Sequence, residues 1–136
     1  MKFLDIASQD MQIQKKILKG IKNVVNTTDF ILGNKVKEFE KEFSKFCDVK
    51  YGVGCANGTD AIILALESLN LPKNSEVILP AMTWCSTLFA VIKANLKPVL
   101  VDIKKNNPTI CTEDLKKKIT KKTSAIVIVH LYGECC

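Results

Sequence analysis

The sequence contains no arginine. Its 20 basic residues are all lysines, and against 14 acidic residues they give a formal net charge of +6. Arginine is the residue best suited to bidentate contacts with phosphates and base edges. The lysines are spread over expected helix faces, and their densest cluster is at 116–118 and 121–122. The composition therefore argues against a nucleic-acid partner, and we expect a solvated helix end and loop at these clusters.

Long apolar runs are also absent. None approaches the roughly 20 residues that span a bilayer, and residues 1–10 lack the hydrophobic stretch of a signal peptide. We therefore expect a cytoplasmic protein with no membrane partner.

Paired cysteine motifs are missing as well, although the chain has six cysteines. Without a C-x-x-C spacing, neither a disulfide framework nor a zinc site is predicted, and we expect buried, reduced thiols. His130, Cys135 and Cys136 lie close together in sequence, but adjacent cysteines are hard to place around one tetrahedral ion. We expect no metal site.

The chain has 136 residues, of which 47% are hydrophobic, so it can bury one core. Apolar residues at helical spacing predict amphipathic helices over 10–25 and from Val36 to Phe46, the second with a core-facing aromatic stripe. Residues 1–50 are thus predicted to be an N-terminal helical segment.

From Tyr51 onward, short apolar runs alternate with helical stretches. The expected strands are 51–55, 76–79, 98–102 and 125–129, and the expected helices are 58–69, 84–95 and 113–119, the last behind a capping Thr112. Several runs lack polar alternation, which is typical of parallel strands covered on both faces. The pattern predicts an α/β fold with a parallel sheet.

The most informative segment is 54–61, Gly-Cys-Ala-Asn-Gly-Thr-Asp-Ala, which joins the first expected strand to an almost wholly apolar helix. Free backbone N–H groups and the helix dipole make such a junction a natural phosphate cradle. Asn57 can cap the helix, Gly58 allows close approach and Thr59 adds a hydroxyl donor. The Asp60 carboxylate would repel a phosphate unless it turns back in a capping box, and we expect that it does. A strand-to-helix turn without a ligand is equally compatible with these residues.

A second segment, 79–86, places the only tryptophan, Trp84, at the start of another helix. Ligands of open parallel sheets bind beyond the carboxyl ends of the strands, so Trp84 and the turn at Gly58 and Thr59 are expected to face one crevice. An indole there offers a flat surface for an aromatic ring, although tryptophan is also a common core residue.

Several ordered motifs resemble the N-terminal part of the DegT/DnrJ/EryC1/StrS sugar aminotransferases. The matching pieces are Phe3-Leu4-Asp5, 30–33 with Val36 and Phe39-Glu40, 57–61, 76–78 through Thr83-Trp84, Pro98-Val99 with Val101-Asp102, and 129–133. The resemblance implies a partial three-layer α/β/α sandwich, the N-terminal part of the large domain of the aspartate aminotransferase (fold type I) fold. Residues 51–136 would form an incomplete large PLP-binding domain.

The same resemblance implies pyridoxal phosphate (PLP) as cofactor, with Gly58 and Thr59 binding its phosphate and Trp84 stacking on its ring. The Gly-Thr-Asp form is similar to members that aminate nucleotide-linked keto-deoxysugars in amino-sugar biosynthesis, using an amino donor and acting as homodimers.

In the family, the Schiff-base lysine and the aspartate that pairs with the ring nitrogen come later in the chain. We therefore expect no catalytic residue here, an inactive chain, and a truncated product, a split-gene half or a fragment. A related PLP-dependent sugar dehydratase and a non-catalytic phosphate-binding or interaction module remain alternatives. A nucleotide-binding domain is disfavoured because no glycine fingerprint is present.

Overall fold

The structure is a computed structural model that describes residues 11–136. Phe3-Leu4-Asp5 and the first residue of the helix expected over 10–25 lie outside the described residues. The described chain separates into two compact units, 11–54 and 55–136. The domain boundary expected between residues 50 and 51 stays a prediction. No helix within 11–136 is long and apolar enough to cross a membrane.

The first unit consists of helices α1 (Met11–Thr27) and α2 (Asn34–Phe46), as the apolar spacing predicts. The Phe39 and Phe43 rings of α2 stack with centroids 5.5 Å apart. They nevertheless remain 59% and 52% exposed. The aromatic stripe expected to face a core is therefore not buried: its rings pack on one another.

Residues 51–55, expected as a strand, form a loop instead. The backbone N–H of Gly54 donates to the Glu40 carboxylate at 2.7 Å. A Cβ on Gly52 would lie 2.8 Å from the Glu40 carbonyl oxygen, so glycine is needed for this close approach. The loop is thus held against α2, and a strand requires a backbone partner that this segment does not have within 11–136.

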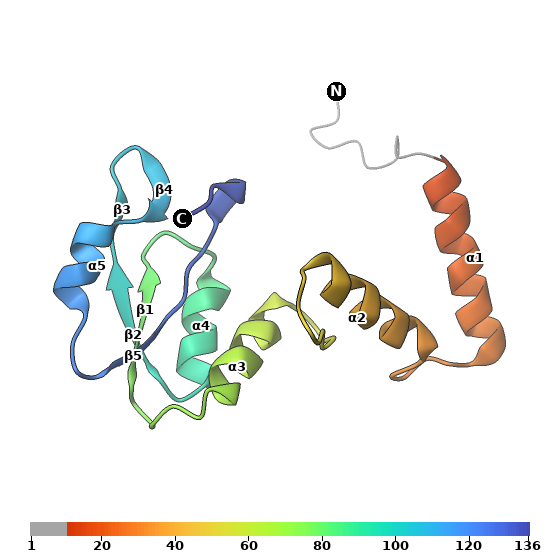
Figure 1. The fold of residues 1–136 in the computed structure, drawn as a ribbon, viewed down its shortest axis with the longest axis horizontal. Coiled ribbons are helices and arrows are strands. Elements are labelled where there is room, and N and C mark those ends of the chain that lie inside the picture. Colours follow the sequence, from red (N-terminus) through yellow and green to blue (C-terminus); the bar gives the residue numbers. More distant parts are fainter. Residues whose placement is uncertain (1–10) are drawn as a thin grey trace. The chain divides into compact units, whose positions relative to one another are not determined.

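The second unit has three layers, which confirms the predicted partial α/β/α sandwich (Figure 1). Its parallel sheet has the order β2-β1-β5. The elements are α3 (Gly58–Ser68), β1 (Glu76–Pro80), α4 (Cys85–Lys93), β2 (Lys97–Val101), β3 (Ile103–Lys104), β4 (Asn107–Ile110), α5 (Thr112–Lys118), β5 (Thr123–Ile126) and a short 3-10 turn at Leu131–Gly133. Helices α3 and α4 cover one face, while α5 and the β3–β4 hairpin lie on the other.

The central strand β1 is buried along its whole length. Val77 and Leu79 pack with Leu66 of α3 and Val91 of α4. Ile78 points to the opposite face, where its cluster contains residues of β2, β4 and α5. Because both faces are covered, the run has no polar alternation, as the sequence indicates.

Other local expectations need correction. Helix α5 begins at Thr112, so the capping position is Cys111, which makes no side-chain cap hydrogen bond. The last strand begins and ends earlier than expected, and the β3–β4 hairpin was not predicted. Its strands are too short to show a period of two residues.

The cysteines were expected to be buried, but the structure shows that they are not. Within 11–136 none forms a disulfide; Cys111 is half-buried and the other five are exposed. They occupy loops and element ends, where packing is thin. The backbone N–H of Cys136 donates to Nδ1 of His130 at 3.0 Å, and no group of three metal-ligating side chains is present in the described part of the chain.

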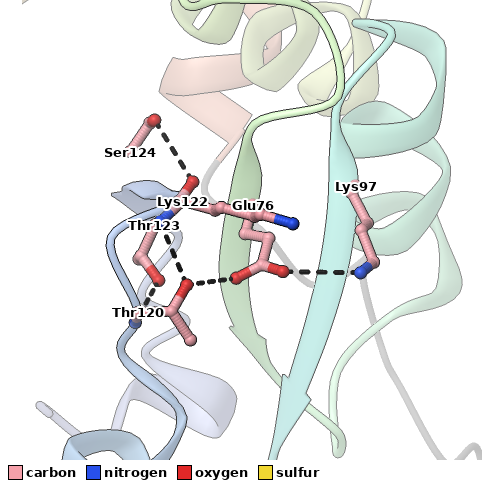
Figure 2. Close-up of polar contacts among 6 residues, drawn as sticks. All are labelled: Glu76, Lys97, Thr120, Lys122, Thr123 and Ser124. Carbon is pink, nitrogen blue, oxygen red and sulfur yellow. Dashed lines mark hydrogen bonds and ion pairs between the residues drawn. The ribbon is translucent and has the colours of Figure 1, made fainter.

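Glu76 links the starting ends of all three strands of the sheet (Figure 2). Its carboxylate accepts a hydrogen bond of 2.7 Å from the Thr120 hydroxyl, in the lead into β5, and one of 3.4 Å from Nζ of Lys97 on β2. Its backbone N–H donates to the Lys122 carbonyl at 2.9 Å. The Thr120 hydroxyl lowers the pKa of Glu76 most strongly, and Lys97 lowers it further.

Lys118 covers the outer edge of β2. Its ammonium donates to the Leu100 carbonyl at 2.7 Å and pairs with Asp114 at 3.0 Å. The Val101 carbonyl accepts from Ala81, which continues β1, so the neighbouring Leu100 carbonyl faces away from β1. An ammonium at this position opposes pairing by a further strand.

We predict that Glu76→Gln lowers stability at neutral pH and weakens the dependence of stability on pH. A folded-state pKa below the usual 4.5 stabilises the fold above that pH, and this contribution is lost as the pH falls through the lower folded value. Glutamine cannot titrate, so the variant lacks this component. Thermal unfolding between neutral pH and pH ~3 measures the difference.

Thr120→Val is the matched variant, because it keeps the carboxylate and removes its main hydrogen bond. The pKa of Glu76, followed by carboxyl-carbon NMR, is expected to rise toward its usual value. An unchanged titration would contradict the role given to Thr120.

Candidate functional site

The amino end of α3 is capped by Asn57. Its backbone is extended, and its Oδ1 accepts the N–H of Asp60 at 3.0 Å. Its carbonyl accepts the N–H of Ala61 at 3.0 Å and so begins the helical hydrogen-bond series. The capping role predicted for Asn57 is confirmed.

Asp60 turns back toward the cap, as expected. Its carboxylate accepts a hydrogen bond of 3.0 Å from Nδ2 of Asn57. The partner is therefore the side-chain amide of the capping residue, whereas a capping box uses its backbone N–H. The two side chains form a reciprocal pair, and an acid in the first turn also suits the helix dipole.

Gly58 and Thr59 leave the amino end of α3 open. Their backbone N–H groups have no acceptor within residues 11–136. A Cβ placed on Gly58 would meet no atom within 4 Å, so the space above the turn is free. Gly58 is exposed and Thr59 is half-buried. Two free donors and a nearby hydroxyl at the positive end of a helix fit a phosphate.

Trp84 occupies the N-cap position of α4, beyond the end of β1. The indole is 74% exposed, so the alternative of a core tryptophan is wrong for this structure. Below it, the hydroxyls of Thr83 and the buried Thr87 lie 2.9 Å apart, and the Thr87 N–H donates to the Trp84 carbonyl at 3.0 Å. These contacts fix the turn that presents the ring.

This threonine pair was missed in the sequence. Two threonines four residues apart across a helix start are a signal that could have found it, because they lie on one side of the first turn.

The topology places both amino ends at the same edge of the sheet. Helix α4 runs from the end of β1 back to the start of the parallel strand β2, and α3 leads into the start of β1. The two helices lie side by side (Figure 1). Gly58, Thr59 and Trp84 are thus brought to the carboxyl edge of the sheet, although no hydrogen bond or ring contact within 11–136 joins the indole to the turn.

The sequence profile of the DegT/DnrJ/EryC1/StrS aminotransferase family matches residues 11–136. The chain belongs to this family. A similar curated relative is the dTDP-3-amino-3,6-dideoxy-alpha-D-galactopyranose transaminase of Aneurinibacillus thermoaerophilus, 37% identical over 134 residues. Another is the UDP-2-acetamido-2-deoxy-3-oxo-D-glucuronate aminotransferase of Pseudomonas aeruginosa, 38% identical over 133 residues. Each alignment covers 98% of this chain and 37% of the relative.

Solved structures are likewise similar to this chain over part of their own length. DesV of S. venezuelae superposes with a TM-score of 0.93 at 32% identity, over 99% of this chain and 36% of that one. The E. coli GDP-4-keto-6-deoxy-D-mannose-3-dehydratase with bound hydrated PLP has a TM-score of 0.79 at 34% identity, over 85% of this chain and 31% of that one. The chain therefore spans about a third of the length of these relatives.

Enzymes of this family are PLP-dependent. The described residues fit the phosphate and ring of that cofactor. At α3, free N–H groups surround a space that no side chain fills, and the Asp60 carboxylate is held by the cap. At α4, the Trp84 indole is exposed.

We predict that Asn57→Ala lowers the free energy of unfolding by about 1 kcal/mol, because the N–H of Asp60 loses its acceptor and the carboxylate loses its donor. Asn57→Ser keeps a capping oxygen and is expected to recover much of the loss. Urea unfolding followed by circular dichroism measures both variants. Equal stability of wild type and Asn57→Ala would contradict the capping role.

Proposed function

We propose that this chain carries the phosphate-binding and ring-binding part of a PLP site in an enzyme that aminates a nucleotide-linked keto-deoxysugar. The observation that carries the proposal is the open amino end of α3 in a chain whose relatives are nucleotide-sugar transaminases. This end offers two backbone donors and a hydroxyl at the positive pole of a helix.

Each residue has a separate role. Gly58 and Thr59 donate their N–H groups to the cofactor phosphate, and the Thr59 hydroxyl adds a third donor. Asn57 keeps the Asp60 carboxylate on the cap, which reduces its repulsion of a phosphate dianion. Trp84 offers a flat apolar face that orients the ring and excludes water from one side. When bound, PLP supplies an electron sink for bonds at the amino-bearing carbon.

The substrates and the assembly are also part of the proposal. The substrate is a nucleotide-linked sugar with a keto group, the second substrate is an amino donor, and the working protein is a homodimer. The names of the Aneurinibacillus and Pseudomonas proteins support the first of these.

A PLP-dependent sugar dehydratase is the second candidate, favoured by the likeness to the E. coli enzyme. The residues described here serve either reaction, because both need the cofactor phosphate and ring held in place. Product analysis of a full-length protein that contains this sequence separates the two: an aminated sugar with the donor present supports transamination, and loss of a hydroxyl supports dehydration.

We predict weak but localised binding of PLP by this chain. Charge-assisted hydrogen bonds contribute roughly 1.5–3 kcal/mol each and ring stacking about 0.5–1.5 kcal/mol, against an association cost of several kcal/mol. The expected affinity is no better than about millimolar. Titration of 15N-labelled chain with phosphate or PLP is expected to shift the amides of Gly58, Thr59 and Asp60 first, and only PLP is expected to quench Trp84 fluorescence.

Gly58→Ala is the variant that tests this site most directly. A Cβ at residue 58 meets no atom of the chain, so folding is expected to be unchanged while the phosphate loses its space. Thr59→Ser is the conservative control that retains the hydroxyl. Shifts centred on the lysines at 116–122, unaffected by Gly58→Ala, would show nonspecific attraction of anions and overturn the site. No binding of PLP by the chain would favour a module without a cofactor.

We also predict that the 136-residue chain alone has no transaminase activity with any nucleotide sugar or amino donor. Transamination needs a lysine that bonds the cofactor and a carboxylate at its ring nitrogen. By family resemblance these residues belong to segments that this sequence does not contain. Turnover by the purified chain, abolished by borohydride trapping of PLP on one of its lysines, would contradict the prediction.

A further inference from the structure

A groove lined mainly by lysines follows one face of helix α1 and reaches the start of α2. It has a volume of about 470 Å³. Its lining includes Lys16, Lys19, Lys22, Asn23, Asn26 and Lys35. Among the described residues, no acidic side chain lines it. Ile13, Ile17 and Ile21 lie on the opposite face of α1, because the helix turns by about 100° per residue. The α1 groove is therefore a positively charged surface, separate from the apolar face of the helix.

The positive charge of the α1 groove is not balanced within the structure. Helix α1 contains four lysines and no acidic residue. Lys35 of α2 pairs with Glu38. Lys16, Lys19 and Lys22, in contrast, form no ion pair in the described part of the chain. These three recur at intervals of three residues, so they are neighbours on the helix surface and repel one another, and carboxylates from another molecule would relieve that repulsion.

Gly20 also lines the α1 groove, in the interior of the helix. Glycine is one of the least favourable residues for a helix interior, because it loses the most backbone freedom on folding. A Cβ at this position would meet no atom within 4 Å, so no contact in the described structure requires a glycine here. The missing side chain leaves the helix backbone open to close approach from outside. The groove thus suits a ligand whose own backbone lies against α1.

We propose that the α1 groove binds an acidic segment of another protein, whose carboxylates lie along Lys16, Lys19 and Lys22 and whose backbone lies against Gly20. Acidic residues three or four positions apart on a helix have the same spacing as the lysines of α1, so one segment can face several ammonium groups at once. The groove belongs to the first unit of the chain, and this proposal does not rest on the proposed function.

Two other anionic partners fit the α1 groove less well. A membrane binds an amphipathic helix through its apolar face. On α1 that face contains Ile17 and Ile21, opposite Lys19, so a bound bilayer would leave the groove empty and facing water. A nucleic acid is bound best by the planar fork of arginine, which the sequence lacks. Carboxylates on a polypeptide need only the point charges that lysines supply.

The test is the binding of a fluorescent octaglutamate peptide, blocked at both ends, to the 136-residue chain, measured by fluorescence anisotropy. An octaglutamine peptide is the uncharged control and is expected not to bind. Combined replacement of the three groove lysines, Lys16→Gln, Lys19→Gln and Lys22→Gln, is expected to weaken octaglutamate binding about tenfold. The physical reason is that each exposed ion pair contributes a factor of roughly two to five.

A matched variant removes the same charge from another part of the chain. The combination Lys116→Gln, Lys117→Gln and Lys121→Gln leaves the α1 groove intact and is expected to change the affinity for octaglutamate less than about twofold. Equal losses in the two combinations would show that only net charge attracts the peptide, and would overturn the proposal.

Gly20→Ala separates docking from the structure of the helix. Alanine favours a helix interior, so the variant is expected to unfold at a higher temperature than the wild-type chain. The added Cβ nevertheless occupies the space in which the ligand backbone lies, and octaglutamate binding is expected to weaken severalfold. A glycine without a role in docking would change only the unfolding temperature.

Several outcomes would overturn the proposal. They are the absence of octaglutamate binding by the wild-type chain, unchanged binding by Gly20→Ala, and tighter binding of pyrophosphate, a DNA oligonucleotide or phosphatidylglycerol vesicles than of octaglutamate. Circular dichroism verifies that each variant is folded. Gly58→Ala is expected to leave octaglutamate binding unchanged, so a failure at the PLP site would count against the proposed function alone.

Discussion

The fold of the second unit depends on β1, which is buried on both faces and pairs with a strand on each side. Val77 and Leu79 anchor α3 and α4 on one face, and Ile78 anchors the β4 and α5 layer on the other. Glu76 adds a polar link at the start of the strand, where its nearly buried carboxylate joins Lys97 and Thr120. Hydrophobic contacts thus set the layers, and a charge-assisted link aligns the strand starts.

The packing of these layers around β1 determines where the candidate site lies. Because α4 returns from the end of β1 to the start of β2, its first residue must lie at the carboxyl edge of the sheet. Helix α3 packs beside it and brings Gly58 and Thr59 to that edge. The capping pair of Asn57 and Asp60 then leaves the remaining donors free. The scaffold alone therefore places the residues of the candidate site, without a separate long loop.

Features set by local pattern could be read from the sequence. The unalternating run around Ile78 and the capping Asn57 are examples, because each depends on neighbours in the chain. The similar run around Val99 forms a strand, but Leu100 on it remains exposed. Features that depend on contacts with other elements of the fold could not be predicted from the sequence. Residues 51–55 have a strand-like composition but form a loop, since a strand also needs a partner for its backbone. The exposure of Trp84 and of the cysteines has the same origin: hydrophobicity predicts burial only where another element arrives to cover the side chain.

The contact between Lys118 and the Leu100 carbonyl has a consequence for assembly. In the terms of polymer chemistry, a sheet with two open edges is a bifunctional monomer, and such units add to one another without limit into fibrils. Closing one edge with an ammonium makes this sheet monofunctional. A monofunctional unit can join one other unit and no more, so self-association through strand pairing stops at a pair. A single lysine at the end of a seven-residue helix thus disfavours open-ended aggregation through this edge.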